Sequence, residues 1–143
     1  MALVIYTDGA SSGNPGPMGI GIVIYKDGFR VEELSEYLGI GTNNMAEYTA
    51  VIRALETAHT MGEHEVHLKS DSQLVIRQLT GEYQVKDPKL RPLKRKIDNL
   101  LHGLDIHFEH IPREKNKEAD KLAKDAVEIG KKQVKKSGQQ TLG

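Results

Sequence analysis

The feature that most constrains the fold is a change in hydrophobic period near residue 42. Before it, apolar side chains alternate along residues 3–7, 20–25 and 29–38, and turn sequences separate these segments. Such alternation is typical of β-strands joined by hairpins. After it, apolar residues recur at helical spacing between short strand-like segments. The chain therefore begins as an antiparallel meander and continues as helices alternating with strands.

Apolar spacing predicts helices over residues 45–58, 74–79, 90–101 and 119–127, and strands at residues 66–68 and 104–108. Asp87-Pro88 is interpreted as the start of the third helix, since aspartate caps helices and proline suits the first turn. Gly130 is interpreted as the end of the last helix. The predicted order is β-β-β-α-β-α-α-β-α. This order implies an α/β fold with a mixed sheet flanked by helices.

Composition limits the class of protein. At 143 residues, the chain fits one domain, predicted over residues 1–130. It has no cysteine and no apolar run that could span a membrane, and its N-terminus lacks the basic segment of a signal peptide. We therefore expect a cytoplasmic protein. Residues 131–143 carry four lysines and no acid and lack apolar periodicity, so a flexible basic tail is predicted.

Four acidic residues stand at the edges of predicted elements: Asp8, Glu47, Asp71 and Asp120. Each has a structural alternative. Asp8 could begin a turn, and Glu47 has capping-box spacing from Asn44. Asp71 could cap a helix, and Asp120 could pair with Lys124 one turn later. Taken singly, none of the four indicates a function.

Topology relates these acids to one another. Asp8 ends the first strand and Asp71 ends the fourth, and a right-handed crossover would make those strands parallel neighbours. Both carboxylates would then meet at one edge of the sheet, where ligands gather in open α/β folds. Glu47 opens the crossover helix, and Asp120 joins them if the last helix crosses the same edge. Because oxygen ligands bind hard divalent cations, metal-dependent phosphodiester chemistry is the leading hypothesis.

The segments around these acids resemble type 1 ribonuclease H in order and spacing over about residues 1–130. The matching stretches are Thr7-Asp8-Gly9 with Gly13 to Pro17, Thr42-Asn43-Asn44 with Glu47, Ser70-Asp71-Ser72-Gln73, and Asn116 to Ala123. The resemblance is to the single-domain prokaryotic form that lacks a basic protrusion, because Gly81 to Pro88 is too short for one. It implies the ribonuclease H-like fold, with a five-stranded mixed sheet.

The resemblance further implies a metal-dependent endonuclease that cleaves the RNA strand of RNA–DNA hybrids and leaves 5′-phosphate and 3′-hydroxyl ends. Asp8, Glu47, Asp71 and Asp120 would be catalytic ligands of two Mg²⁺ ions, which Mn²⁺ could replace. The implied substrate-binding residues are Gly9, Ala10, Asn14, Thr42, Asn43, Asn44 and Gln73. Amides can both donate to and accept from the 2′-hydroxyls that only RNA presents. Helix capping is the alternative role for the asparagines.

Two further features depart from the family pattern, one in the loop before the last helix and one at the N-terminus. Residues 111–116 contain no histidine, although some bacterial members carry one there, so Arg113 and Lys115 are candidate accessory residues. His110 reads as an ordinary strand residue, and the histidines at 59, 64, 67, 102 and 107 show no metal-ligand arrangement. We expect no separate N-terminal hybrid-binding domain. The basic residues at 86–96 either contact phosphates or form a solvated helix face.

Other functions remain open from the sequence. A related nuclease could cut double-stranded RNA, and a binding module on the same fold could hold nucleic acid without cutting it. A ribonuclease H portion of a reverse transcriptase is a further alternative. The retention of all four acids favours catalysis over binding alone. We expect a monomer that acts on RNA–DNA hybrid, with double-stranded RNA as a possible second substrate, and that has no membrane partner.

Overall fold

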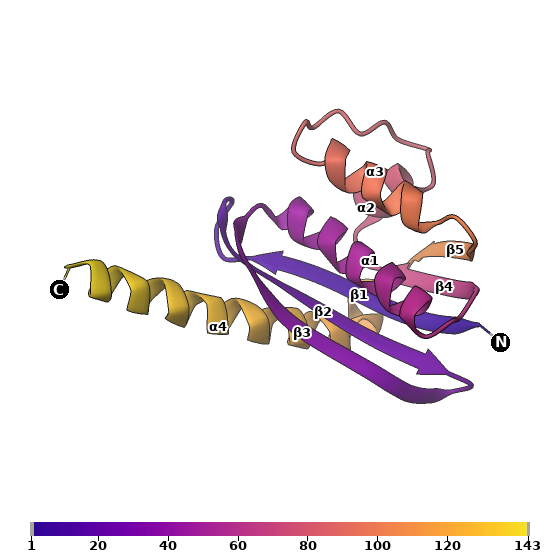
Figure 1. The fold of residues 1–143 in the computed structure, drawn as a ribbon, viewed down its shortest axis with the longest axis horizontal. Coiled ribbons are helices and arrows are strands. Elements are labelled where there is room, and N and C mark those ends of the chain that lie inside the picture. Colours follow the sequence, from indigo (N-terminus) through magenta and orange to yellow (C-terminus); the bar gives the residue numbers. More distant parts are fainter. Residues whose placement is uncertain (1, 143) are drawn as a thin grey trace.

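The computed structural model describes the backbone of residues 2–142 and the burial of side chains through residue 135. Its elements follow the predicted order (Figure 1). They are β1 (Leu3–Ser11), β2 (Gly16–Lys26), β3 (Phe29–Gly41), α1 (Asn43–Thr60), β4 (Glu65–Ser70), α2 (Gln73–Leu79), α3 (Arg91–Leu100), β5 (Asp105–His110), the 3₁₀ turn η1 (Arg113–Lys115) and α4 (Lys117–Leu142).

The strands form one five-stranded sheet in the order β3-β2-β1-β4-β5. β1 and β2 pair antiparallel, as do β2 and β3, whereas β4 pairs parallel with both β1 and β5. The predicted mixed sheet is therefore confirmed, including the parallel neighbours β1 and β4. This pairing places Thr7 of β1 beside Ser70, the last residue of β4, and β1 continues past that point to Ser11.

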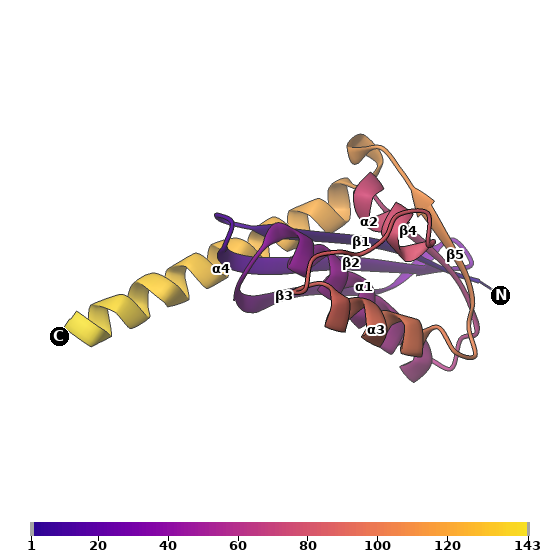
Figure 2. The same cartoon turned by 90° about the horizontal axis from the view of Figure 1, so that it is seen from above.

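Helices cover both faces of the sheet. α1 packs on one face, with α2 and α3 beside it, and α4 crosses the other face over β1, β2 and β3 (Figures 1 and 2). Alternate strand residues such as Ile5 and Ile22 are buried with Tyr48 and Leu55 of α1. On the opposite face, Val23 is buried, as are Ala119 and Ala123 of α4. The three-layer arrangement fixes α1 and α4, the helices that carry Glu47 and Asp120.

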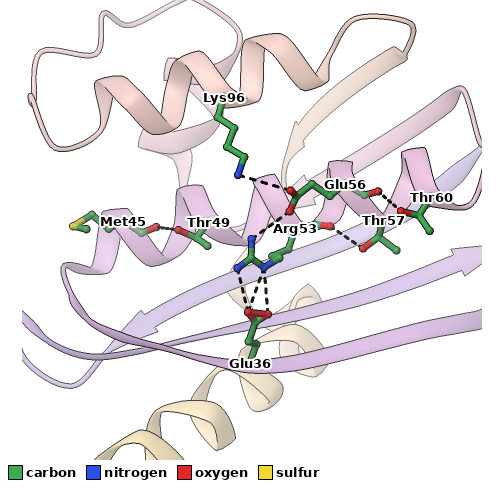
Figure 3. Close-up of polar contacts among 8 residues, drawn as sticks. All are labelled: Glu36, Met45, Thr49, Arg53, Glu56, Thr57, Thr60 and Lys96. Atoms are coloured by element: carbon green, nitrogen blue, oxygen red, sulfur yellow. Dashed lines mark hydrogen bonds and ion pairs between the residues drawn. The ribbon is translucent and has the colours of Figure 1, made fainter.

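A polar network holds α1 between a strand and a helix (Figure 3). Arg53 of α1 contacts Glu36 of β3 at 3.2 Å and Glu56 of its own helix at 3.2 Å. Lys96 of α3 lies 3.8 Å from Glu56. The hydrogen bond with Glu36 is the main cause of a raised pKa at Arg53. Because these side chains are partly exposed, the network adds little stability but links three elements.

Two predicted helix boundaries were wrong. α3 begins at Arg91 rather than at Asp87-Pro88, because Asp87 instead accepts the backbone N–H of Lys89 at 2.9 Å in a preceding turn. α4 continues past Gly130 to Leu142 and projects beyond the sheet in Figures 1 and 2. Flexibility of the basic segment 131–143 stays a prediction. Within residues 2–142, no helix combines the length and apolar character needed to cross a membrane.

Candidate active site

The end of the β1–β4 pair defines the edge at which the acids meet. Thr7 of β1 pairs with Ser70 of β4 as the last parallel partners, and Asp8 and Asp71 each follow by one residue. Ser72 is the N-cap of α2, and its hydroxyl accepts the N–H of Val75 at 3.3 Å. Asp71 is therefore not the helix cap, and its side chain is available at the sheet edge.

A close approach between β1 and α1 places the second acid. A Cβ added at Gly9 would collide with the backbone of Ala46 and Glu47, so only glycine permits this contact. Thr42 caps α1, and its hydroxyl accepts the N–H of Met45 at 3.2 Å. Since Thr42 and not Asn44 is the cap, Glu47 is not part of a capping box. Its carboxyl group lies beside Asp8 instead.

The fourth acid comes from the opposite face of the sheet. A Cβ added at Gly21, the β2 partner of Asp8, would collide with the backbone oxygen of Ala119 in α4. This close packing carries the first turn of α4 to the same edge. Asp120 lines the same cavity as Asp8 and also pairs with Lys124 at 2.8 Å. The predicted ion pair is thus present, and it does not remove Asp120 from the cluster.

The structure therefore brings all four predicted carboxylates together. Asp8, Glu47 and Asp71 each offer an oxygen atom, and these atoms lie within 4.8 Å of one another. With Asp120, they line a cavity of about 150 Å³. Asp8 and Glu47 are each only 5% exposed. Three carboxylates held this closely would repel one another unless protons or cations neutralise them.

Burial and mutual repulsion shift the pKa values of the two most buried acids. Burial first, and then the charge of Asp71, raise the pKa of Asp8 to about 7. Burial and the charge of Asp8 raise the pKa of Glu47 well above its ordinary value, and a hydrogen bond from the Gly9 backbone opposes this shift. The ionised cluster is therefore unfavourable without a cation. Like-charged carboxylates with only oxygen donors suit a hard divalent ion, which prefers oxygen ligands.

Asn116 organises the cluster, although the sequence did not identify it as a site residue. Its Nδ2 donates to the backbone oxygen of Thr7 at 2.9 Å and to Asp71 Oδ2 at 3.2 Å. Its Oδ1 is buried and lacks a hydrogen-bond partner among the described residues. The available signal was its position four residues before Asp120, one helical turn away.

Two cationic side chains line the same cavity, Arg113 from η1 and Lys124 from α4. Lys124, also missed from the sequence, has a raised pKa because its ammonium group hydrogen-bonds with Asp120. Lys115, the other predicted accessory residue, instead lines a separate cavity of about 500 Å³ beside Tyr6 and Tyr25. That cavity is larger, but none of the four carboxylates lines it. The chemistry therefore assigns the smaller cavity as the site.

Only some of the predicted substrate-binding residues line this cavity. Gly9, Ala10 and Asn43 line it. Asn14 accepts the backbone N–H of Asn43 at 3.2 Å, which connects the β1–β2 turn to the start of α1. Asn44 is half-buried in the first turn of α1, and Gln73 is exposed at the start of α2. Outside this site, His67 and His107 converge with Glu109, a proximity that the sequence did not predict.

Comparison with known proteins gives consistent matches. A family profile described as Reverse transcriptase-like matches residues 6–126. A protein named Ribonuclease HI from Halobacterium salinarum is 45% identical over 125 residues, covering 86% of this chain. The crystal structure of RNase H1 from that archaeon matches with a TM-score of 0.87 at 44% identity, over 90% of this chain and 99% of that one.

A structure solved with nucleic acid also matches. LC11-RNase H1 in complex with an RNA/DNA hybrid has a TM-score of 0.84 and 44% identity, covering 89% of this chain and 97% of that chain. The chain spans 63% of the length of the Halobacterium relative and 36% of the mycobacterial relatives that match at 38% identity.

Proposed function

The chain belongs to the type 1 ribonuclease H family, and from that premise we propose that it is a divalent-metal-dependent endonuclease that hydrolyses the RNA strand of RNA–DNA hybrids. The products would carry 5′-phosphate and 3′-hydroxyl ends. The RNA/DNA hybrid bound by the LC11 relative supports this substrate class.

The observation that supports this function most is the carboxylate cluster at the β1–β4 edge. Asp8, Glu47 and Asp71 converge within 4.8 Å, and burial together with the charge of Asp71 raises the pKa of Asp8 to about 7. A structural role would leave such acids paired with cations or exposed to water. Keeping them buried and close together costs stability in the free protein, so the arrangement is best explained by cation binding.

Asp8, Glu47, Asp71 and Asp120 would hold two Mg²⁺ ions, and Mn²⁺ could replace them. When bound, the ions supply the charge that activates water and stabilises the leaving 3′ oxygen in an in-line displacement. Asn116 would fix the orientation of Asp71 through its 3.2 Å hydrogen bond. Its unpartnered Oδ1 supplies a further acceptor for a water molecule or ligand at this edge.

Recognition of the hybrid would rest on the residues around the cavity. Asn43, Asn44 and Gln73 are amides at the first turns of α1 and α2, and amides can exchange hydrogen bonds with 2′-hydroxyls. Asn14 would support Asn43 through its backbone contact. Thr42 would form part of a pocket for a phosphate of the DNA strand, because it lies at the N-terminus of α1, where backbone N–H groups favour anions.

Gly9 and Ala10 would let the substrate backbone approach closely beside Asp8. Arg113 would contact a phosphate near the cluster, since it lines the same cavity. Lys115 would act away from the carboxylate cluster, because it lines the other cavity. A catalytic domain over residues 1–130, a monomeric state and a cytoplasmic location stay predictions.

A substrate panel tests this proposal. The protein is incubated with end-labelled RNA–DNA hybrid, double-stranded RNA, single-stranded RNA and double-stranded DNA, each with Mg²⁺, with Mn²⁺ or with a chelator. We expect the RNA strand of the hybrid to be cut only when a metal ion is present. Cutting of double-stranded RNA at an equal rate would change the substrate class, and an intact hybrid in both metals would refute the function.

Asp120→Asn provides the matched test of the site, with Asp125→Asn as its control. Both acids lie on α4 and pair with a lysine one turn away, at 2.8 Å for Asp120 and 2.9 Å for Asp125. Only Asp120 lines the cavity. We expect a large loss of cleavage in Asp120→Asn and none in Asp125→Asn. Equal activities would show that Asp120 does not belong to the site.

A further inference from the structure

A second group of ligand side chains lies on the adjacent parallel strands β4 and β5. His67 of β4 and His107 of β5 are direct partners in the sheet register. Glu109 follows His107 by two residues, so its side chain leaves β5 on the same face. The register therefore gathers two imidazoles and one carboxylate on one small area of the sheet.

The three side chains converge rather than merely sharing a face. His67 Nε2 lies 2.8 Å from Glu109 Oε1. The rings of His67 and His107 meet edge to face, with centroids 4.6 Å apart. One ligand atom from each of the three residues lies within 4.8 Å of the others. This proximity suits a shared cation, because Zn²⁺ binds histidine nitrogen and carboxylate oxygen at about 2 Å.

The neighbouring side chains and helices do not block these three residues from binding an ion. Lys69 is the register partner of Glu109, but its ammonium group lies 5.4 Å from the centroid of the Tyr6 ring. The side chains of His67 and Glu109 are 34% and 42% exposed, so ions can reach them from solvent. α4 packs over β1, β2 and β3, away from this edge of the sheet.

The chemistry of the ligands selects the class of metal. Imidazole nitrogen suits Zn²⁺, Ni²⁺, Co²⁺ and Cu²⁺, whereas Mg²⁺ prefers carboxylate and water oxygens. The cluster thus differs in preference from the all-oxygen site at Asp8, Glu47 and Asp71. His67 also precedes Asp71 by four strand positions, which corresponds to about 13 Å along β4. The two sites are therefore separate in chemistry and in space.

We propose that His67, His107 and Glu109 bind a first-row transition-metal dication such as Zn²⁺, with water completing its coordination. The ion joins the edge strand β5 to its inner neighbour β4. Because it binds the paired strands and not the unfolded chain, it stabilises the folded protein. This site is independent of the nuclease function, which would use the other end of β4.

Histidine NMR spectra during a Zn²⁺ titration test the site directly, with Mg²⁺ present in excess to occupy the oxygen-ligand site. The chain has six histidines, so four of them serve as internal controls. Signals are assigned with single histidine-to-asparagine variants. We expect the imidazole signals of His67 and His107 to shift together at low Zn²⁺ concentration and those of His59, His64, His102 and His110 to remain unchanged.

Glu109→Gln tests the third ligand, and Glu65→Gln on β4 is its control, since Glu65 is exposed and outside the cluster. We expect Zn²⁺ affinity to fall at least about tenfold in Glu109→Gln, as for loss of a ligand, and to be unchanged in Glu65→Gln. The proposal is overturned if His67 and His107 do not respond, if all six histidines respond alike, or if Glu109→Gln binds Zn²⁺ as tightly as the original protein.

Discussion

Asn116 connects three parts of the active site through one buried amide. Its Nδ2 reaches the Thr7 backbone and Asp71, and its own backbone oxygen accepts the N–H of Asp120 at 3.0 Å. We predict that Asn116→Ala lowers the free energy of unfolding by about 1–3 kcal/mol, because the Thr7 oxygen loses its donor. We also predict about a tenfold or greater loss in kcat/KM, because Asp71 loses its orientation.

Urea denaturation and steady-state cleavage of a labelled hybrid measure the two effects. Asn99→Ala is the matched control, because Asn99 is exposed on α3. It should change stability by less than about 0.5 kcal/mol, as is usual for surface substitutions. If Asn116→Ala behaves like this control in both measurements, Asn116 does not position the site.

The raised pKa values of Asp8 and Glu47 predict how stability depends on pH in the metal-free protein. Folding lifts the pKa of Asp8 from 3.8 to about 7, so the folded state binds more protons than the unfolded state between these values. The free energy of unfolding should therefore fall as pH rises from 5 toward about 7, by up to about 1.4 kcal/mol per pH unit for one group. Above the raised pKa, this contribution is lost.

Thermal unfolding in a chelating buffer between pH 5 and pH 8 measures this dependence. Asp8→Asn removes one titrating group and should flatten the curve, whereas Asp125→Asn should leave it unchanged. Adding Mg²⁺ should restore stability mainly at the upper end of the range, where the carboxylates are ionised. A curve that rises between pH 5 and pH 7 in the metal-free protein would contradict the account.

Individual site residues were predictable to different degrees. Asp71 could be predicted because it directly follows β4. Asp8 lies inside β1, which continues to Ser11, but it is the first residue beyond the pairing with β4, so the two acids still share an edge. Asn116 was missed because its function depends on a contact with the Thr7 backbone, which is 109 residues away in the sequence. His67, His107 and Glu109 were missed because their convergence depends on the β4–β5 register, and their sequence spacing carries no metal-binding pattern.

At the level of elements, the contact between β2 and α4 determines where Asp120 lies. We predict that Gly21→Ala destabilises the fold by about 1–3 kcal/mol, because the added methyl group collides with the backbone of α4. Displacement of α4 should also lower hybrid cleavage, because Asp120 moves with the helix. Thermal unfolding and cleavage rates measure both effects.

Lys121→Ala is the control for this prediction. It changes α4 on its exposed side, where Lys121 pairs with Asp125 at 2.9 Å. We expect nearly unchanged stability and activity in this variant. Gly21→Ala with full stability and full activity would mean that α4 tolerates displacement and that its close packing does not set the site.

Glycine also explains why one helix end was predicted wrongly. Gly130 reads as a stop signal in the sequence, yet α4 continues through it to Leu142. A Cβ at this position would collide with the ring of Tyr37 in β3. The residue therefore provides space for packing between distant elements. Local sequence does not distinguish that role from helix termination. Periodicity did predict the α1 helix, and the handedness of the crossover predicted that β1 and β4 are parallel neighbours.

At the level of the whole molecule, charge is unevenly distributed along a neutral chain. Residues 131–143 contain four lysines and no acid, so the rest of the chain carries the opposite net charge. We predict that removing residues 131–143 weakens hybrid binding but retains the fold and cleavage. The slope of log affinity against log salt should become shallower by about 0.9 for each lysine that contacts a phosphate.

Fluorescence anisotropy with a labelled hybrid at several salt concentrations tests this prediction, in an Asp71→Asn background that prevents cleavage. A full-length variant with glutamine in place of the four tail lysines separates the effect of charge from that of helix length. Both variants should give the same shallower slope. An unchanged slope in both would show that the tail does not contact nucleic acid.

The central claim is that the carboxylates at the β1–β4 edge bind the metal ions that the protein needs to hydrolyse the RNA strand. The most direct measurement is the cleavage rate of one RNA–DNA hybrid as a function of Mg²⁺ concentration, for the original protein and for Asp71→Asn, with hybrid affinity measured in parallel. We predict a rate that rises and saturates with Mg²⁺ in the original protein, and no cleavage but retained binding in Asp71→Asn. Cleavage without a divalent metal ion, or undiminished cleavage by Asp71→Asn, would contradict the account.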